Sequence, residues 1–125
     1  MEAERKFRVT GIDMTGYMAK DTARALAFYR NVLGLEPTTV YPEGAGAEYE
    51  FPDGTAFGLF NGGDQVPFRP GTGVMFAVDD FDAAVSAAKA QGAVITTQFE
   101  SPVCFMAVTQ DPEGNSLMIH KRKKT

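Results

Sequence analysis

His120 and Cys104 are the two side chains of this chain that could transfer a proton or attack a substrate near neutral pH. Each is the only residue of its type. The unperturbed pKa of histidine lies near neutrality, so His120 is a candidate catalytic acid or base; a structural role at the end of a strand is the alternative. Cys104 would need an activating base to act as a nucleophile. Because the chain has no second histidine, packing is the expected role of Cys104.

Glu48 and Glu50 are further candidates, because paired carboxylates can act as acid and base. They alternate with Tyr49 and Phe51 along a segment whose pattern predicts a strand. Residues two apart on a strand lie on the same face, so the two carboxylates should share one face. That face is either a carboxylate pair at a site or, the simpler interpretation, a solvated outer surface.

Composition and charge exclude several classes of protein. The chain has 125 residues, 44% of them hydrophobic, and a net charge of −4, which fits one domain or two fused half-domains. The acidic balance argues against nucleic acid as a partner, and the basic residues 121–124 read as a solvated tail. No segment approaches the ~20 apolar residues of a membrane helix. The N-terminus does not resemble a signal peptide, and with a single cysteine we expect a cytoplasmic protein.

Two segments with helical periodicity must position these side chains. They are DTARALAFYRNVLG, residues 21–34, and DDFDAAVSAAKAQG, residues 79–92. The opening aspartates, Asp21 and Asp79, can cap exposed amide groups. The closing glycines, Gly34 and Gly92, can adopt the left-handed conformation that ends a helix. Apolar residues recur at helical spacing between them, so each helix should pack on a sheet.

A tight turn also occurs twice, as PDGT at residues 52–55 and PEGN at residues 112–115. Each precedes an apolar segment typical of a strand. The first proline follows Asp21 by 31 residues and the second follows Asp79 by 33 residues. Two elements that recur in the same order at similar spacing indicate a duplicated module. Since the linker at residues 61–73 is rich in glycine and proline, we place the halves at residues 1–62 and 63–125.

The remaining apolar segments read as strands, and each half then has the order β-α-β-β-β. The fold class is therefore α+β, with two tandem βαβββ modules. The expected strands are residues 8–18, 35–41, 47–51 and 55–60 in the first half, and 73–78, 93–99, 103–109 and 115–121 in the second.

The chain resembles the vicinal oxygen chelate superfamily, which includes glyoxalase I, extradiol dioxygenases, and fosfomycin and bleomycin resistance proteins. Three groups of residues carry the resemblance: AFY and VLGL within residues 27–35, FAVDD at residues 76–80, and DPEGN at residues 111–115. No single group is specific, but together they span nearly the whole chain. The resemblance implies the glyoxalase-like fold, in which two βαβββ modules form a curved mixed sheet around a cavity, and it implies a homodimer.

The resemblance also implies where a metal would bind. Catalytic members hold a divalent metal through histidine, glutamine or glutamate on the first and last strands of each module. The family spacing places these positions at Met14, Gly73 and Met118, with the fourth at Gly58, or at Phe57 if the register shifts by one residue. Glycine and phenylalanine have no ligating side chain, and thioethers are poor ligands for oxygen-binding metals. We therefore expect neither a metal nor another cofactor.

Strand alternation predicts the lining of the cavity, which should be apolar and rich in sulfur. Methionine adapts to irregular shapes, and small residues leave space for a ligand; the alternative is that these side chains simply fill the core. The candidate ligand-binding residues are Met14, Met18, Gly58, Phe60, Gly73, Met75, Met118 and His120.

Three functions are consistent with this pattern. The first is metal-free binding of a small hydrophobic or aromatic molecule, as in bleomycin resistance proteins. The second is metal-independent lyase or isomerase chemistry that uses His120. The third is a regulatory or interaction module without a ligand. A metal-dependent glyoxalase or dioxygenase is the function against which the sequence argues most directly.

Overall fold

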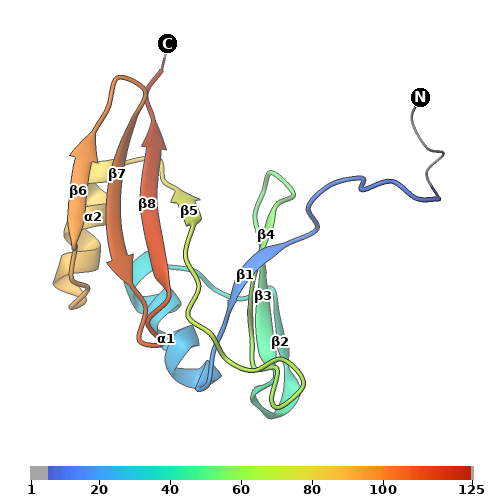
Figure 1. The fold of residues 1–125 in the computed structure, drawn as a ribbon. Coiled ribbons are helices and arrows are strands. Elements are labelled where there is room, and N and C mark those ends of the chain that lie inside the picture. Colours follow the sequence, from blue (N-terminus) through green and yellow to red (C-terminus); the bar gives the residue numbers. More distant parts are fainter. Residues whose placement is uncertain (1–5, 125) are drawn as a thin grey trace.

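The computed structural model describes residues 6–124 and contains two helices and eight strands (Figure 1). It confirms the α+β class and the two tandem βαβββ modules. The first module contains β1 (Thr15–Met18), α1 (Thr22–Leu33), β2 (Thr39–Tyr41), the short 3-10 turn η1 (Pro42–Gly44), β3 (Gly46–Glu50) and β4 (Ala56–Phe60). The second contains β5 (Val74–Ala77), α2 (Phe81–Ala90), β6 (Thr97–Glu100), β7 (Cys104–Gln110) and β8 (Ser116–Arg122).

Each module forms a four-stranded mixed sheet of the same topology. The strand order is β1-β4-β3-β2 in the first sheet and β5-β8-β7-β6 in the second. In both sheets the first and last strands of the module are parallel neighbours, and the remaining pairs are antiparallel. The two sheets stand side by side in Figure 1. β1 and β5 are therefore edge strands, and neither pairs with the other module.

The helices begin and end through the residue types that the sequence suggests. Asp21 caps α1 by accepting a hydrogen bond from the amide of Arg24, and Gly34 ends it with a φ of 68°. The second helix is capped by Asp80, one residue later than we expected from Asp79. Neither helix found within residues 6–124 combines the length and apolar character of a membrane span.

The two modules share one aromatic core. Phe57 of β4 contacts Phe76 of β5 edge to face, with ring centroids 4.9 Å apart. Tyr29 of α1 packs against both rings, at 5.2 Å and 6.0 Å. All three side chains are buried, and Leu117 of β8 belongs to the same cluster. Residues from both halves thus bury apolar surface that neither half covers alone.

A buried polar network around the DPEGN turn also joins the modules. The hydroxyl of Tyr29 donates a hydrogen bond of 2.9 Å to Asp111 Oδ2, and Asn115 Nδ2 donates to the same oxygen. Asn115 Nδ2 is also within bonding distance of the Met18 carbonyl of β1, at 3.1 Å. The hydroxyl of Tyr17, also on β1, donates to the Ser116 carbonyl of β8. Hydrogen bonds around the DPEGN turn of the second half therefore connect the two halves, and we call this network the polar joint.

Glu113 belongs to this joint, because its carboxylate caps the helix of the other half. Its Oε1 accepts a hydrogen bond of 2.9 Å from the amide of Asp21 and lies 3.3 Å from the guanidinium of Arg24. Burial alone would raise the pKa of Glu113, but these hydrogen bonds and the Arg24 charge lower the pKa below its usual value. In a capping box, a glutamate in the first turn of a helix accepts a hydrogen bond from the amide of the cap residue. Glu113 accepts the same bond for α1, but from the other half of the chain.

The pKa of Glu113 predicts a pH dependence of stability. A carboxylate whose pKa is lower in the folded state stabilises the fold above its unfolded pKa, and this contribution is lost as the pH falls through the folded pKa. We expect the free energy of unfolding of the unmodified protein to exceed that of Glu113→Gln near pH 7 and the difference to shrink below about pH 4.5, the ordinary pKa of the group. Urea titrations across this range measure the difference. A difference that stays constant with pH would contradict the assignment.

The main departure from the expected strands is at the start of the chain. We expected a strand over residues 8–18, but β1 begins at Thr15, and residues 6–14 form an extended arm that runs away from both sheets (Figure 1). Thr15 pairs with Phe57, and β4 begins at Ala56. The residues before Met14 therefore have no partner in β4, because the segment before Ala56, residues 52–55, forms a turn.

Candidate functional site

Strand register bears on the two residues expected at the fourth family position, Gly58 and Phe57. Gly58 pairs with Gly16 of β1, as Met118 pairs with Met75 of β5. Gly58 and Met118 are therefore equivalent in the two modules. Phe57 points instead into the core, where it is 1% exposed. The register therefore favours Gly58 over Phe57.

The residues at the four family positions do not suit the metal that catalytic members hold. Two of them, Gly58 and Gly73, have no side chain, and the thioethers of Met14 and Met118 are poor ligands for oxygen-binding cations. In the part of the chain that the structure describes, no three histidine, cysteine, aspartate or glutamate side chains come together. The side chains at the family positions therefore do not fit the divalent metal of the catalytic members.

Three of the predicted cavity residues of the first half lie together on the sheet face away from the core. A β-carbon on Gly58 would lie 2.7 Å from Met14 Sδ and 2.4 Å from the ring of Phe60, so both side chains cover this glycine. Met18 lies further along, where its methyl group approaches Gly62. The grouping predicted from alternation is thus present, but Met18 is at its margin.

The carboxylates of β3 lie on this same face of the first sheet. Glu48 pairs with Gly58, and Glu50 pairs with Ala56. Glu48 is half-buried and Glu50 is exposed. Interaction with Glu48, with a smaller effect of burial, raises the pKa of Tyr41. The two carboxylates share a face as expected, but no further titratable partner makes them an acid–base pair.

The predicted residues of the second half form another group. Met75 pairs with Met118, and His120 pairs with Ala77 and with Met106. Cross-strand partners lie on the same face, so these side chains share the face of the second sheet that is turned away from α2. Gly73 precedes β5 with a φ of 103° and has open space around it. Met106 was missed from the sequence, although alternation along β7 together with hairpin register could have found it.

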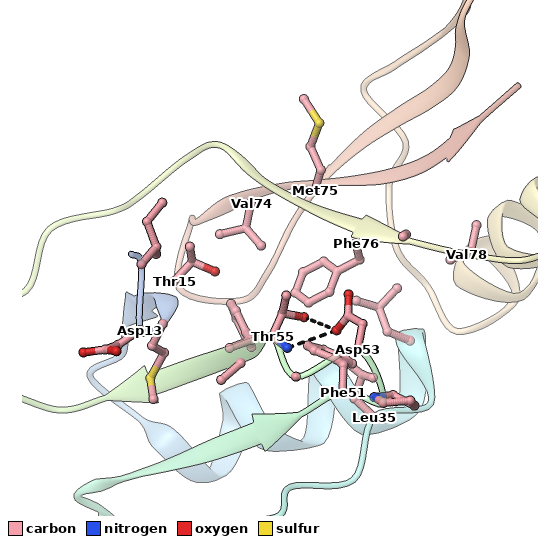
Figure 2. Close-up of a pocket in the computed structure, with 18 residues that line it drawn as sticks. Asp13, Thr15, Leu35, Phe51, Asp53, Thr55, Val74, Met75, Phe76 and Val78 are labelled. Carbon is pink, nitrogen blue, oxygen red and sulfur yellow. Dashed lines mark hydrogen bonds between the residues drawn. The ribbon is translucent and has the colours of Figure 1, made fainter. Parts of the chain in front are cut away.

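A cleft of about 820 Å³ opens between the two modules (Figure 2). Its walls come from the edge strands β1 and β5, the end of α1, and the turn that joins β3 to β4. Only Met14 and Met75 of the eight predicted cavity residues line it. The apolar side chains that line the cleft and were not predicted are Ile12, Leu33, Leu35, Phe51, Phe57, Val74, Phe76 and Val78.

The charge of the cleft comes from two carboxylates alone. Asp13 and Asp53 line it, and none of its lining residues is lysine, arginine or histidine. Hydrogen bonds from the hydroxyl and the amide of Thr55 lower the pKa of Asp53, so this group is ionised at neutral pH. Figure 2 shows Asp53 held by Thr55 below Phe76. The cleft therefore offers an apolar interior with a negative rim.

His120 lies outside this cleft and lacks the partner that would make it a general base. Its side chain is half-buried on β8, and among residues 6–124 no carboxylate forms an ion pair with it. A catalytic histidine is usually oriented by such a group. Cys104 lies 3.4 Å from the Ser101 hydroxyl, which is no activating base.

Comparison with known proteins agrees with this architecture. The sequence model of the Glyoxalase/Bleomycin resistance protein/Dioxygenase superfamily matches residues 11–119. No curated protein sequence matches. Among solved structures, a lactoylglutathione lyase from Agrobacterium tumefaciens superposes with a TM-score of 0.72 and 24% identity over 91% of this chain and 95% of that one. TnmS3, an antibiotic binding protein from Streptomyces sp. CB03234, gives 0.76 and 18% over 94% and 99%. These identities show a shared fold, and the family match shows that the chain belongs to the glyoxalase/bleomycin resistance protein/dioxygenase superfamily.

Proposed function

We propose that this protein binds a small hydrophobic or aromatic molecule, without a metal, in the cleft between its modules. The observation that carries the proposal is the cleft itself, about 820 Å³ in volume and lined mainly by apolar side chains. Ligand pockets typically have this size and composition. Met14 and Met75 of the predicted site are at its wall, together with Phe51, whose half-buried aromatic ring suits a flat ligand.

The rim limits the ligand class further. A desolvated anion near the ionised Asp53 would be repelled, whereas a neutral or cationic group would not. The ligand is thus apolar and either uncharged or positively charged. That one structural relative is an antibiotic binding protein is consistent with sequestration of such a molecule.

Filling the cleft tests the proposal. Thr15 is exposed and lines the cleft, so Thr15→Trp should occupy the space without disturbing the core. We expect the neutral dye Nile red to bind the unmodified protein, and Thr15→Trp to weaken that binding by at least about tenfold. Fluorescence titration measures the affinity.

Thr97→Trp is the matched control, because Thr97 is an exposed threonine on the edge strand β6, away from the cleft. It should leave dye binding unchanged. Equal effects of the two substitutions, or no binding by the unmodified protein, would refute the site. The anionic dye ANS should bind more weakly than Nile red because of the rim charge.

A homodimer is the second part of the proposal, and the exposed arm supports it. Phe7, Val9 and Ile12 are 76%, 84% and 84% exposed. Large apolar side chains this exposed, in an extended segment outside both sheets, are expected to be covered by another surface. We expect light scattering to give twice the chain mass of 13.5 kDa, and Phe7→Asp with Val9→Asp to give a monomer. A monomeric unmodified protein would refute the dimer.

The lyase or isomerase alternative rests on His120, which is outside the cleft and has no orienting carboxylate among the described residues. The other alternative, a regulatory or interaction protein without a ligand, gives the cleft no function. The single free cysteine suits a reducing, cytoplasmic setting.

A further inference from the structure

The second sheet carries a group of soft donor atoms that the cleft does not use. Strand register places Met75 beside Met118, and Met106 beside His120. Met106 and Met118 are diagonal neighbours on β7 and β8, because Met118 pairs with Val108. We call Met106, Met118 and His120 the thioether patch. Met106, Met118 and His120 do not line the cleft, so the patch is a separate feature.

The side chains of the patch point to one side and are accessible. Figure 2 shows Met75 and Phe76 on opposite sides of β5, with Phe76 turned into the core. Met75, on the same face, is 50% exposed, and the three members of the patch are half-buried. Directly paired side chains, such as Met106 and His120, have β-carbons about 4.5–5.5 Å apart, and diagonal neighbours, such as Met106 and Met118, about 7–8 Å. Methionine has three rotatable bonds beyond the backbone, so two sulfur atoms and an imidazole can converge on one point above the sheet. Met75 lies across β8 from Met106, so the sulfur atoms of these two residues are too far apart to share one ion.

The donor set selects the ion. Thioethers are soft ligands that favour Cu(I), and imidazole also binds copper well. Hard cations such as magnesium and calcium require oxygen ligands. The residues that β5, β7 and β8 place on this face include no carboxylate, and the charged side chain among them, Arg122, is positive. A divalent ion would find no negative ligand to balance its charge here, whereas a soft monovalent ion can bind through neutral donors alone.

We propose that the thioether patch binds one cuprous ion through the sulfur atoms of Met106 and Met118 and the imidazole of His120. Cys104 lies on the same face but is not part of the donor set, because its thiol lies 3.4 Å from the Ser101 hydroxyl within its own hairpin. The site is distinct from the family metal positions, with which it shares only Met118.

Anaerobic titration of the full chain with Cu(I), in competition with the chromophoric chelator bicinchoninate, tests the proposal. We expect the protein to withdraw one equivalent of Cu(I) from the chelator. Met118→Leu and Met106→Leu should each weaken binding by at least about tenfold. Leucine conserves volume, so both variants should fold. Met18→Leu, on the first sheet, is the matched control and should bind Cu(I) unchanged.

Two outcomes would overturn the proposal. One is no withdrawal of Cu(I) from the chelator by the unmodified protein. The other is loss of binding in Cys104→Ser with no effect of Met106→Leu or Met118→Leu, which would indicate coordination by the thiol. Methyl resonances of methionine provide a second readout: Ag(I), a redox-inert analogue, should shift those of Met106 and Met118 and leave those of Met14 and Met18 in place.

Discussion

Replacing Asp111 with alanine should lower the free energy of unfolding by at least about 3 kcal/mol. Asp111 is 5% exposed and accepts four hydrogen bonds, from the Tyr29 hydroxyl, the Asn115 side chain and the amides of Glu113 and Asn115. Alanine would leave these buried donors without an acceptor, and each unsatisfied donor costs about 1–3 kcal/mol. Urea unfolding followed by circular dichroism measures the loss.

Two buried tyrosines provide the matched controls for Asp111. Tyr29→Phe removes one donor to Asp111 and should destabilise the protein by about 1–3 kcal/mol. Burial, and next the negative charge of Asp111, raise the pKa of Tyr29, so its hydroxyl stays protonated as a donor. Tyr49 is equally buried, but its hydroxyl has no hydrogen-bond partner among the described residues. Tyr49→Phe should therefore be neutral or stabilising. If both tyrosine variants lost equal stability, packing rather than the polar joint would explain the Asp111 result.

Local signals in the sequence predicted most of the fold because they act within one module. The helix expected at residues 21–34 is Thr22–Leu33, bounded by the aspartate cap and the left-handed Gly34. Alternation along the strands placed Met75, Met118 and His120 on one face correctly. These motifs were thus sufficient to predict the two modules. They were also sufficient to show that the residues at the expected family metal positions are glycine and methionine.

The cleft was not predictable in the same way, because contacts between modules create it. Leu33 is the last residue of α1, Leu35 follows the helix, and Phe51 begins a turn; no periodicity places them beside β5. The two repeated turns show the same difficulty. Phe51 and Asp111 precede equivalent turns, yet the first lines the cleft and the second is buried in the joint. Which copy of a repeat is buried depends on packing that single-strand patterns do not contain.

The shared core leads to the prediction with the largest effect, that neither half folds alone. The fragments of residues 1–62 and 63–125 should each give a poorly dispersed amide NMR spectrum and no cooperative thermal transition. A chain of about 60 residues buries only about 60% of its unfolded surface and is marginally stable even with a complete core. Here the first fragment would expose Tyr29 and Phe57 where they now contact Phe76, and the second would expose Leu117 of the same cluster.

Mixing the two fragments distinguishes this prediction from simple loss of solubility. Each fragment supplies half of the polar joint, with Tyr29 and Arg24 on one and Asp111 and Glu113 on the other. An equimolar mixture should therefore recover a dispersed spectrum and a single transition, and Asp111→Ala in the second fragment should weaken this recovery. A first fragment that unfolds cooperatively by itself would contradict the prediction, because it would mean that its buried apolar surface is sufficient without the second module. The linker at residues 61–73 would then join two independent domains, and the cleft between them would no longer be held at a fixed width by the common core.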